Sequence, residues 1–398
     1  MDLLLAMLVG QLELSVWGYV LVALGLTHVT IVSVTIFLHR HQSHNSISLN
    51  PLLSHFFRFW IWLTTGIVTK QWVAIHRKHH AKCETADDPH SPQIQGINKI
   101  LWQGREVYRQ AAGQQEILDK YGNGTPDDWL ERHLYGRFPI IGILCMLIID
   151  LVLFGALGLT IFAIQMLWIP FWAAGVINGI GHYWGYRNFE TEDASRNIFP
   201  WGILIGGEEL HNNHHAYASS ARLSNKWWEL DIGWFYIRLL ALFGLIKVLK
   251  IAPAIRLVAD KQFIDIDTVR AVVRNRFHIL SLYGRMVIRP VINEECQRAN
   301  DYFKNLYQGI GKLLSREDLQ PAENESRQVI EVLEHNKTIE TVYRLKQQLK
   351  DLWQNSSSQQ VNRIQRLQAW CQEAEQTGIV ALQEFAAYLR GYTLKSAI

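Results

Sequence analysis

The sequence predicts an all-α integral membrane protein with a cytosolic helical cap and a C-terminal helical appendage. Three observations lead to this prediction. Two long apolar blocks, residues 12–38 and 138–186, contain no Lys or Arg, so all 39 basic residues of the 398-residue chain lie outside them. Clusters of histidine stand where apolar segments meet charged ones. After about residue 253, apolar residues become sparse and recur at helical spacing among Gln, Glu, Arg and Lys.

The apolar blocks set the number of spans. Residues 12–38 are long enough for one transmembrane helix, because about 20 apolar residues cross a hydrocarbon layer. Residues 138–186, with Asp150 as their only charged residue, are long enough for two helices joined near residues 155–158. Residues 1–9 are too short to cross alone, and we expect an amphipathic lead-in or a partial helix there. The sequence therefore predicts three to four transmembrane helices.

Residues 52–68 are apolar too, but we expect them to be interfacial or re-entrant. If they crossed the membrane, His39 and His76 would end on opposite sides of a layer about 30 Å thick and could not share a site. With residues 52–68 at the interface, every histidine cluster and every basic residue falls on one face. The positive-inside rule identifies that face as cytoplasmic.

The chain divides into two predicted domains, a membrane-embedded domain at residues 1–251 and a cytosolic helical region at 252–398. Within the junction, residues 232–258 mix apolar side chains with Arg and Lys, which predicts a basic amphipathic helix at the interface. Residues 338–353 and 361–388 show helical spacing. The four cysteines form no Cys-x-x-Cys pair, which indicates a reduced setting without disulfides.

Nine histidines are predicted to carry the chemistry. They comprise a His-x-x-x-x-His pair, two His-x-x-His-His triplets and one solitary residue: His39 and His44; His76, His79 and His80; His211, His214 and His215; and His182. Residues three and four apart share a helix face, so each triplet can face the same ions. Imidazole suits iron, copper, zinc or nickel, and nine ligands are too many for one ion. The pattern therefore favours a dinuclear metal centre.

Two other metal sites are disfavoured. His-Glu-x-x-His, the zinc protease motif, is absent. A soluble carboxylate-bridged di-iron bundle needs Glu-x-x-His from two helices, and only Glu208 to His211 has that spacing. Asp87, Asp88 and Glu208 are candidate partners of the ligand histidines, with simple solvation as the alternative for each. The remaining histidines are interpreted as bystanders: His28, His41, His55, His90, His133, His278 and His335.

Over about residues 12–251 the chain resembles the membrane fatty-acid desaturase family, which includes the stearoyl-CoA desaturases. The three histidine boxes match in order and type, and the likeness is greatest to bacterial acyl-lipid and acyl-CoA Δ9 desaturases. Further agreement lies around the boxes, in Glu84-Thr85, Asp88-Pro89-His90, Asn178, Gly185-Tyr186-Arg187, Gly207-Glu208 and Trp228-Glu229-Leu230-Asp231.

The resemblance implies a cytosolic cap with two iron ions held by the nine histidines, with Asn178 touching one iron through water. It also implies that Trp72 lines the acyl tunnel. The implied reaction introduces a cis double bond, at Δ9, into a phospholipid-linked or CoA-linked acyl chain while O2 is reduced to two waters. In the animal enzymes a Thr-Trp pair stands at the position of Ala174-Gly175, so the tunnel wall is expected to differ here.

The chain is expected to need a separate protein as its electron donor. It carries no cytochrome b5 motif, His-Pro-Gly-Gly, and no Gly-x-Gly-x-x-Gly loop, so electrons are expected from a separate donor such as a ferredoxin or flavin reductase. The other expected partners are the bilayer and a fatty-acyl lipid or acyl-CoA, with no nucleic acid. The expected location is a bacterial inner membrane, with the active site on its cytoplasmic face.

Two alternatives stay open at this point. One is a membrane di-iron hydroxylase of alkanes, carotenoids or acyl chains, although the Asp-Pro-His and Asn178/His182 context favours desaturation. The other is a non-enzymatic metal transporter or sensor, which is disfavoured because the spans offer only Asp150 and His28 as a polar path. The end of the chain, with Tyr343, Leu352-Trp353 and Phe385-Ala386 among its matches, is faintly similar to the helical end of some DDE transposases, and we expect a structural appendage there.

Overall fold

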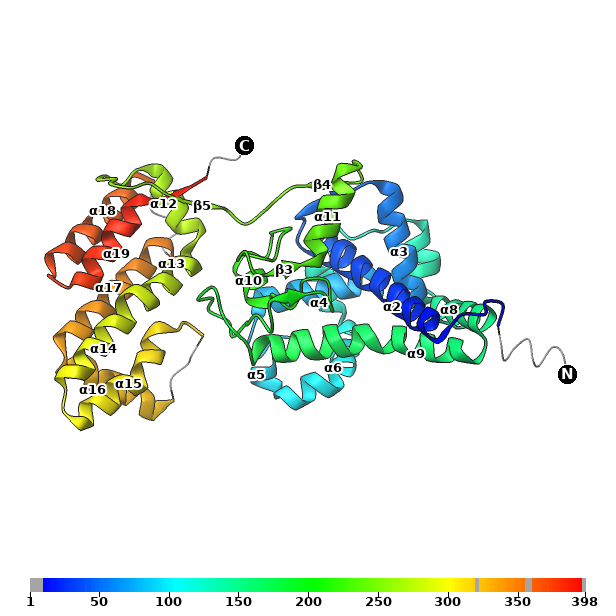
Figure 1. Ribbon diagram of the computed structural model, residues 1–398, viewed down its shortest axis with the longest axis horizontal. Helices are drawn as coiled ribbons and strands as arrows, with labels where there is room; N and C mark the ends of the chain where they lie inside the picture. The colour runs from blue at the N-terminus through cyan, green and yellow to red at the C-terminus, as the bar shows by residue number, and fades with distance from the viewer. Residues whose placement is uncertain (1–9, 319–321, 355–359, 396–398) are drawn as a thin grey trace. The chain divides into compact units, whose positions relative to one another are not determined.

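The computed structural model describes residues 10–318, 322–354 and 360–395 (Figure 1). The helix or lead-in expected for residues 1–9 lies outside the described residues. The chain divides into two compact units, one of Met1–Arg187 with Asp193–Ala252 and one of Asn188–Glu192 with Pro253–Ile398. Both units are mostly helical, as the sequence predicts. The sequence-based division placed residues 188–192 in the first domain, whereas the structure groups them with the second unit.

The first unit consists of helices joined by short strands and long turns. In chain order its elements are α2 (Val16–Ser33), η1 (Val34–Ser43), β1 (Ile47–Leu49), α3 (Pro51–Thr65), α4 (Thr69–Lys82), α5 (Pro92–Gln95), α6 (Ile97–Ala112), α7 (Gln115–Tyr121), η2 (Glu131–Tyr135), α8 (Pro139–Phe154), α9 (Ala156–Ile169), η3 (Pro170–Ile177), η4 (Ile180–His182), β2 (Trp201–Gly202), α10 (His211–Ala216), β3 (Leu230–Asp231), α11 (Ile232–Leu242) and β4 (Ile246–Val248). Helices α2, α3, α8 and α9 pack against one another.

Two helices of the described chain are long and apolar enough to cross a membrane. One is α2 with η1, Val16–Ser43, and the other is α9 with η3 and η4, Ala156–His182. Helix α8 is apolar but shorter. The break predicted near residues 155–158 falls at Gly155, which has a positive φ of 59° that side-chain-bearing residues rarely adopt. The exact number of spans stays a prediction.

Helix α3 covers residues 52–65 of the stretch that we expect at the interface. Asn50 caps it, Pro51 is its first residue, and Gly66 ends it with a positive φ of 63°. Its 15 residues extend about 22 Å, less than the thickness of the hydrocarbon layer. The buried Arg58 side chain of α3 forms ion pairs with Asp128 at 2.6 Å and Glu131 at 3.0 Å.

The prediction of a helix over residues 232–258 is wrong for the second half of that segment. Helix α11 ends at Leu242, and Gly244, with φ 69°, turns the chain. Residues Ile246–Val248 then form β4, which pairs antiparallel with β1. Pairing with β1 determines that residues 246–248 form a strand, because the edge of β1 offers backbone hydrogen bonds that a helix would not use.

The second unit is a helical domain with a hydrophobic core of its own. Its elements are β5 (Ile255–Leu257), α12 (Ile266–Arg274), α13 (Arg276–Tyr283), η5 (Gly284–Ile288), α14 (Arg289–Arg298), α15 (Asp301–Ser315), α16 (Glu323–His335), α17 (Lys337–Gln354), α18 (Gln360–Gln376), α19 (Val380–Gly391) and β6 (Tyr392–Leu394). Tyr283, Trp370 and Phe385 are buried together at its centre. The helical spacing of residues 338–353 corresponds to α17, and that of 361–388 to α18 and α19, which separate at Gly378.

Candidate metal centre

The structure brings all nine predicted histidines together within the first unit. They come from four segments that are far apart in sequence: η1 with the residue after it, α4, η4 and α10. Helix α4 presents His76, His79 and His80 on one face because three- and four-residue spacings align there. Helix α10 presents His211, His214 and His215 in the same way.

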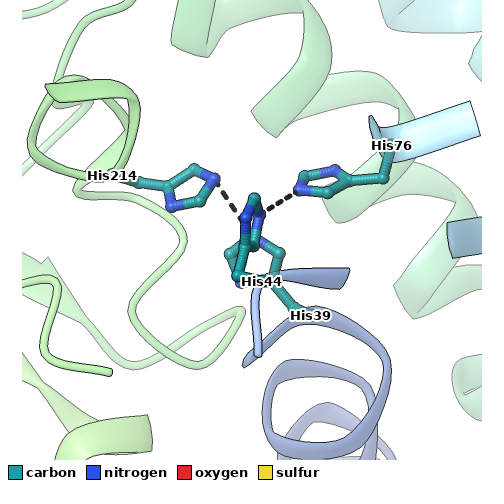
Figure 2. Close-up of side chains that lie close together, drawn as sticks. All are labelled: His39, His44, His76 and His214. Atoms are coloured by element: carbon teal, nitrogen blue, oxygen red, sulfur yellow. Dashed lines mark hydrogen bonds between the residues drawn. The ribbon is translucent and has the colours of Figure 1, made fainter. Parts of the chain in front are cut away.

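A first group of imidazoles contains His39, His44, His76 and His214. One ring nitrogen from each lies within 4.8 Å of the others. Nε2 of His44 is 2.8 Å from Nε2 of His76, and Nε2 of His39 is 3.1 Å from Nε2 of His214. Figure 2 shows the four rings turning these nitrogens toward one another. His80 joins the group through its Nε2, which is 2.8 Å from that of His214.

A second group lies beside the first and contains His79, His182 and His215, with Cys83 at its edge. One possible ligand atom from each of these four residues lies within 4.8 Å of the others. Nε2 of His182 is 3.2 Å from Nε2 of His79 and 3.0 Å from Nε2 of His211. The rings of His80 and His215 stack with centroids 4.5 Å apart and so join the two groups.

The donor atoms fit a metal centre. Two nitrogens bound at right angles to one ion, with bonds of about 2.1 Å, would be about 3.0 Å apart. The contacts between facing Nε2 atoms are 2.8–3.2 Å. A pair of neutral imidazoles can place only one proton between two such nitrogens, and Nε2 of His215 is buried with no hydrogen-bond partner among the described residues. A cation between the rings would satisfy these lone pairs.

Four carboxylates approach the outer nitrogen of four of these rings. The contacts to Nδ1 are Glu208 to His39 at 2.8 Å, Asp88 to His79 at 3.0 Å, Glu84 to His182 at 3.1 Å and Asp193 to His215 at 2.9 Å. For His79, His182 and His215 the contact is a hydrogen bond. In these three rings the carboxylate holds the proton on Nδ1, so the lone pair of Nε2 faces the centre, and it also fixes the orientation of the ring. Glu208 lies at ion-pair distance from Nδ1 of His39 without an aligned hydrogen bond.

Sequence reasoning found only part of this outer set. Asp88 and Glu208 lie close to ring nitrogens of His79 and His39. Asp87 is exposed and its carboxylate faces Lys82, so the solvated alternative holds for Asp87. Glu84 and Asp193 were missed. Both lie outside helices, in turns whose path the sequence does not specify, and Glu84 has a positive φ of 59°.

Burial keeps most of these imidazoles neutral. It lowers the pKa of His44, His76, His80, His211 and His214 well below the ordinary value, and neighbouring histidines lower it further. Burial lowers the pKa of His215 to about 4, with Asp193 opposing the shift. His79 differs, because Asp88 raises its pKa although burial lowers it. Neutral imidazole is the form that binds metals. Burial also raises the pKa of the Cys83 thiol well above its usual range, so the metal-free site holds a neutral thiol.

The metal-free protein is expected to lose stability as the pH falls from about 6.5 toward 4. In this window the unfolded chain takes up protons at histidines that stay neutral when folded, since the pKa of His215 falls to about 4 and that of His90 to about 3. Glu209, whose pKa burial raises to about 7, and His79 act in the opposite direction, but they are outnumbered. Thermal unfolding of metal-stripped protein in detergent measures the effect, and a stability that rises on acidification would contradict it.

Of the two other predicted site residues, Trp72 contacts the histidines of the centre, whereas Asn178 makes no hydrogen bond to them among the described residues. The Trp72 ring stacks on the His76 ring, with centroids 5.0 Å apart and planes at 14°, and meets His39 edge-on. It therefore covers one side of the first group. Asn178 follows η3 and is half-buried, and within the described residues its amide makes no hydrogen bond to a histidine.

Of the bystander histidines, His90 is the exception. The other six have partners elsewhere; for example, His28 contacts the Tyr236 hydroxyl at 2.9 Å and His41 the Ile47 carbonyl at 3.0 Å. His90 is buried and stacks on His79 with ring centroids 4.3 Å apart. The interpretation of His90 as a bystander is wrong in position, because the turn after α4 folds back and returns His90 to the centre.

Comparison with known proteins gives the same assignment for the first unit. The family model "Fatty acid desaturase" matches residues 15–240. The chain is 30% identical to Delta-9 acyl-lipid desaturase 1 of Arabidopsis thaliana, covering 59% of this chain and 76% of that protein. It is 30% identical to sn-1 stearoyl-lipid 9-desaturase of Synechocystis sp., covering 56% and 68%. It is also 30% identical to Acyl-CoA 5-desaturase AL21 of Anemone leveillei, covering 58% and 74%.

A second family model, "Transposase", matches residues 264–395, which form most of the second unit. This match is separate from the histidine centre, which lies entirely in the first unit. The desaturase model covers more than half of the chain, and the relatives compared above are named as desaturases. The alternative of a non-enzymatic metal transporter or sensor is therefore wrong. This chain belongs to the fatty acid desaturase family and is an oxidoreductase.

Proposed function

We propose that the protein introduces a cis double bond at the Δ9 position of a fatty acyl chain, using O2 and two iron ions. The proposed ligands are the nine histidines, with Asn178 acting on one iron through water. The observation that carries the proposal is the convergence of nine imidazoles on two adjoining groups, with a carboxylate close to the outer nitrogen of four of the rings. Bound iron would supply the O2 activation that an unactivated methylene requires, since no acid or base side chain breaks such a bond.

The chain's own residues prepare the centre. Glu84, Asp88 and Asp193 keep the proton on Nδ1 of their histidines, so Nε2 stays free for the metal. Glu208 places a negative charge 2.8 Å from Nδ1 of His39. Trp72 is proposed to contact the acyl chain, because its ring forms an apolar wall directly on His76. A wall of this kind excludes water from the reacting methylene and fixes its position next to the centre.

The proposed acyl carrier is a membrane phospholipid, with acyl-CoA as the competing carrier. The names of two relatives, an acyl-lipid desaturase and a stearoyl-lipid desaturase, support the lipid-linked chain. The proposed setting is a bacterial inner membrane, crossed by three to four helices, with the centre on the cytoplasmic face. Residues 252–398 are proposed to be a cytosolic helical domain. Electrons are proposed to come from a separate ferredoxin or flavin reductase.

Expression in a host that lacks its own desaturase tests the function. We expect new cis-monounsaturated fatty acids under oxygen and none without it, measured by gas chromatography of fatty acid methyl esters. Purified protein supplied with a donor system and with either defined phospholipid or acyl-CoA identifies the carrier. Hydroxylated products would instead identify a hydroxylase. An unchanged profile from folded, iron-loaded protein would refute the proposal.

A further inference from the structure

Cys83 lies at the second histidine group, one residue after the end of α4 and four residues after His79. Its Sγ is 3.8 Å from Nε2 of His79 and 3.9 Å from Nδ1 of His182. Cys145 lies in α8 and the other two cysteines in the second unit, and none of these belongs to a histidine group among the described residues. The chain thus places one of its four cysteines against the metal centre.

The separation of sulfur and nitrogen matches that of two ligands on one ion. With metal–sulfur and metal–nitrogen bonds of about 2.3 and 2.1 Å, the two donor atoms would be about 3.1 Å apart at a right angle and about 3.6 Å apart at a tetrahedral angle. The observed 3.8 Å between Sγ of Cys83 and Nε2 of His79 is close to the tetrahedral value. The second histidine group therefore offers a sulfur donor at ligand distance from Nε2 of His79, the nitrogen that faces the centre.

An independent observation shows that a cation belongs at this position. The His215 side chain is only 2% exposed, and its Nδ1 is held by Asp193 at 2.9 Å. Its Nε2 has no hydrogen-bond partner among the described residues. One ring nitrogen of His215 lies within 4.8 Å of a possible ligand atom of Cys83, His79 and His182. A buried nitrogen lone pair without a donor is costly, and a bound cation removes that cost.

We propose that Cys83 is a ligand of the metal ion in the second histidine group, so that this ion has a sulfur donor in addition to imidazoles. The inference rests on the proposed metal centre, but it does not depend on the acyl substrate. When the ion binds, the S–H bond breaks, the sulfur keeps the electron pair and binds the ion, and the proton passes to solvent. Thiolate is a softer donor than imidazole, so the two ions are chemically different.

Cobalt substitution of the full-length protein in detergent tests the proposal. A thiolate bound to Co²⁺ gives an intense sulfur-to-metal absorption band in the near ultraviolet, which histidine ligands do not give. We expect this band in the wild type and its loss in Cys83→Ser, with the visible bands of histidine-bound cobalt retained in both. Cys145→Ser is the matched control and should keep the near-ultraviolet band.

The outcomes separate this inference from the proposed function. Cobalt bound without the near-ultraviolet band, or a band that persists in Cys83→Ser, would overturn the sulfur ligand and leave the histidine centre in place. A protein that binds no cobalt would overturn both. If Cys83→Ser does not fold, X-ray absorption of the cobalt-loaded wild type decides alone, since a sulfur ligand adds a scatterer at about 2.3 Å and its absence would refute the proposal.

Discussion

Replacing His79 by alanine is expected to abolish product formation and to remove iron from the protein. His79 lies between two parts of the site, with Nε2 facing His182 at 3.2 Å and Nδ1 held by Asp88 at 3.0 Å. Alanine removes the proposed ligand and leaves the buried Asp88 carboxylate without its imidazole partner. Loss of an outer partner alone typically lowers metal affinity or activity by about 10- to 100-fold, so loss of the ligand should exceed about 100-fold.

Iron per chain and desaturated product, measured on the same preparations, check this expectation. Asp88→Asn keeps the His79 imidazole but removes the charge beside it. Its metal affinity or activity should be lower than that of the wild type by about 10- to 100-fold, a smaller loss than in His79→Ala. His133→Ala is the matched control, because His133 is exposed and stacks on Trp129 away from the centre. Full iron content and normal product in His79→Ala would show that the histidine groups are not the catalytic centre.

The histidine groups could be predicted because their signal is local. A His-x-x-His-His triplet is placed on one face by helix geometry alone, so both triplets point inward once α4 and α10 form. The residues that were missed have no such signal. Glu84, Asp193 and His90 reach the centre through turns whose path depends on the packed structure. Cys83 was overlooked because a cysteine outside a Cys-x-x-Cys pair is usually a small buried apolar residue.

The fold shows the same division between local and tertiary causes. Apolar length predicted the long helices, and the break between α8 and α9 occurs at the glycine-containing segment where it was expected. Helical periodicity likewise predicted α17 to α19. The strand β4 could not be predicted, because residues 246–248 become a strand only by pairing with residues 47–49, two hundred positions earlier in the chain.

A second large effect is expected from the buried ion pair between Arg40 and Asp231. Their side chains are 1% and 0% exposed, and Nη2 of Arg40 donates to Oδ1 of Asp231 at 2.9 Å. The guanidinium also donates to the Thr35 hydroxyl at 2.6 Å and to the Gly206 carbonyl at 3.2 Å. The fit is tight, because a Cβ at Gly233 would lie 2.1 Å from Nη1 of Arg40. Either partner alone would thus be a buried charge without its counter-ion.

Arg40→Met is expected to lower the free energy of unfolding by about 3–5 kcal/mol, because it leaves Asp231 buried and unpaired. Denaturant titration of the protein in detergent measures the change. The double variant Arg40→Met/Asp231→Leu should lose less than the sum of the two single changes, since no buried charge is left. Arg132→Ala breaks an exposed pair with Asp127 and is the matched control, with little expected change.

Arg40→Met should also weaken metal binding, because the ion pair is connected to the centre. The Thr35 hydroxyl that receives a hydrogen bond from Arg40 donates in turn to Oε1 of Glu208 at 2.6 Å. The same Oε1 lies 2.8 Å from Nδ1 of His39. Without Arg40, the Thr35 hydroxyl and the Glu208 carboxylate are no longer held in place, and the orientation of His39 is no longer fixed. Wild-type stability and iron content in Arg40→Met would show that Glu208 orients His39 without help from the ion pair.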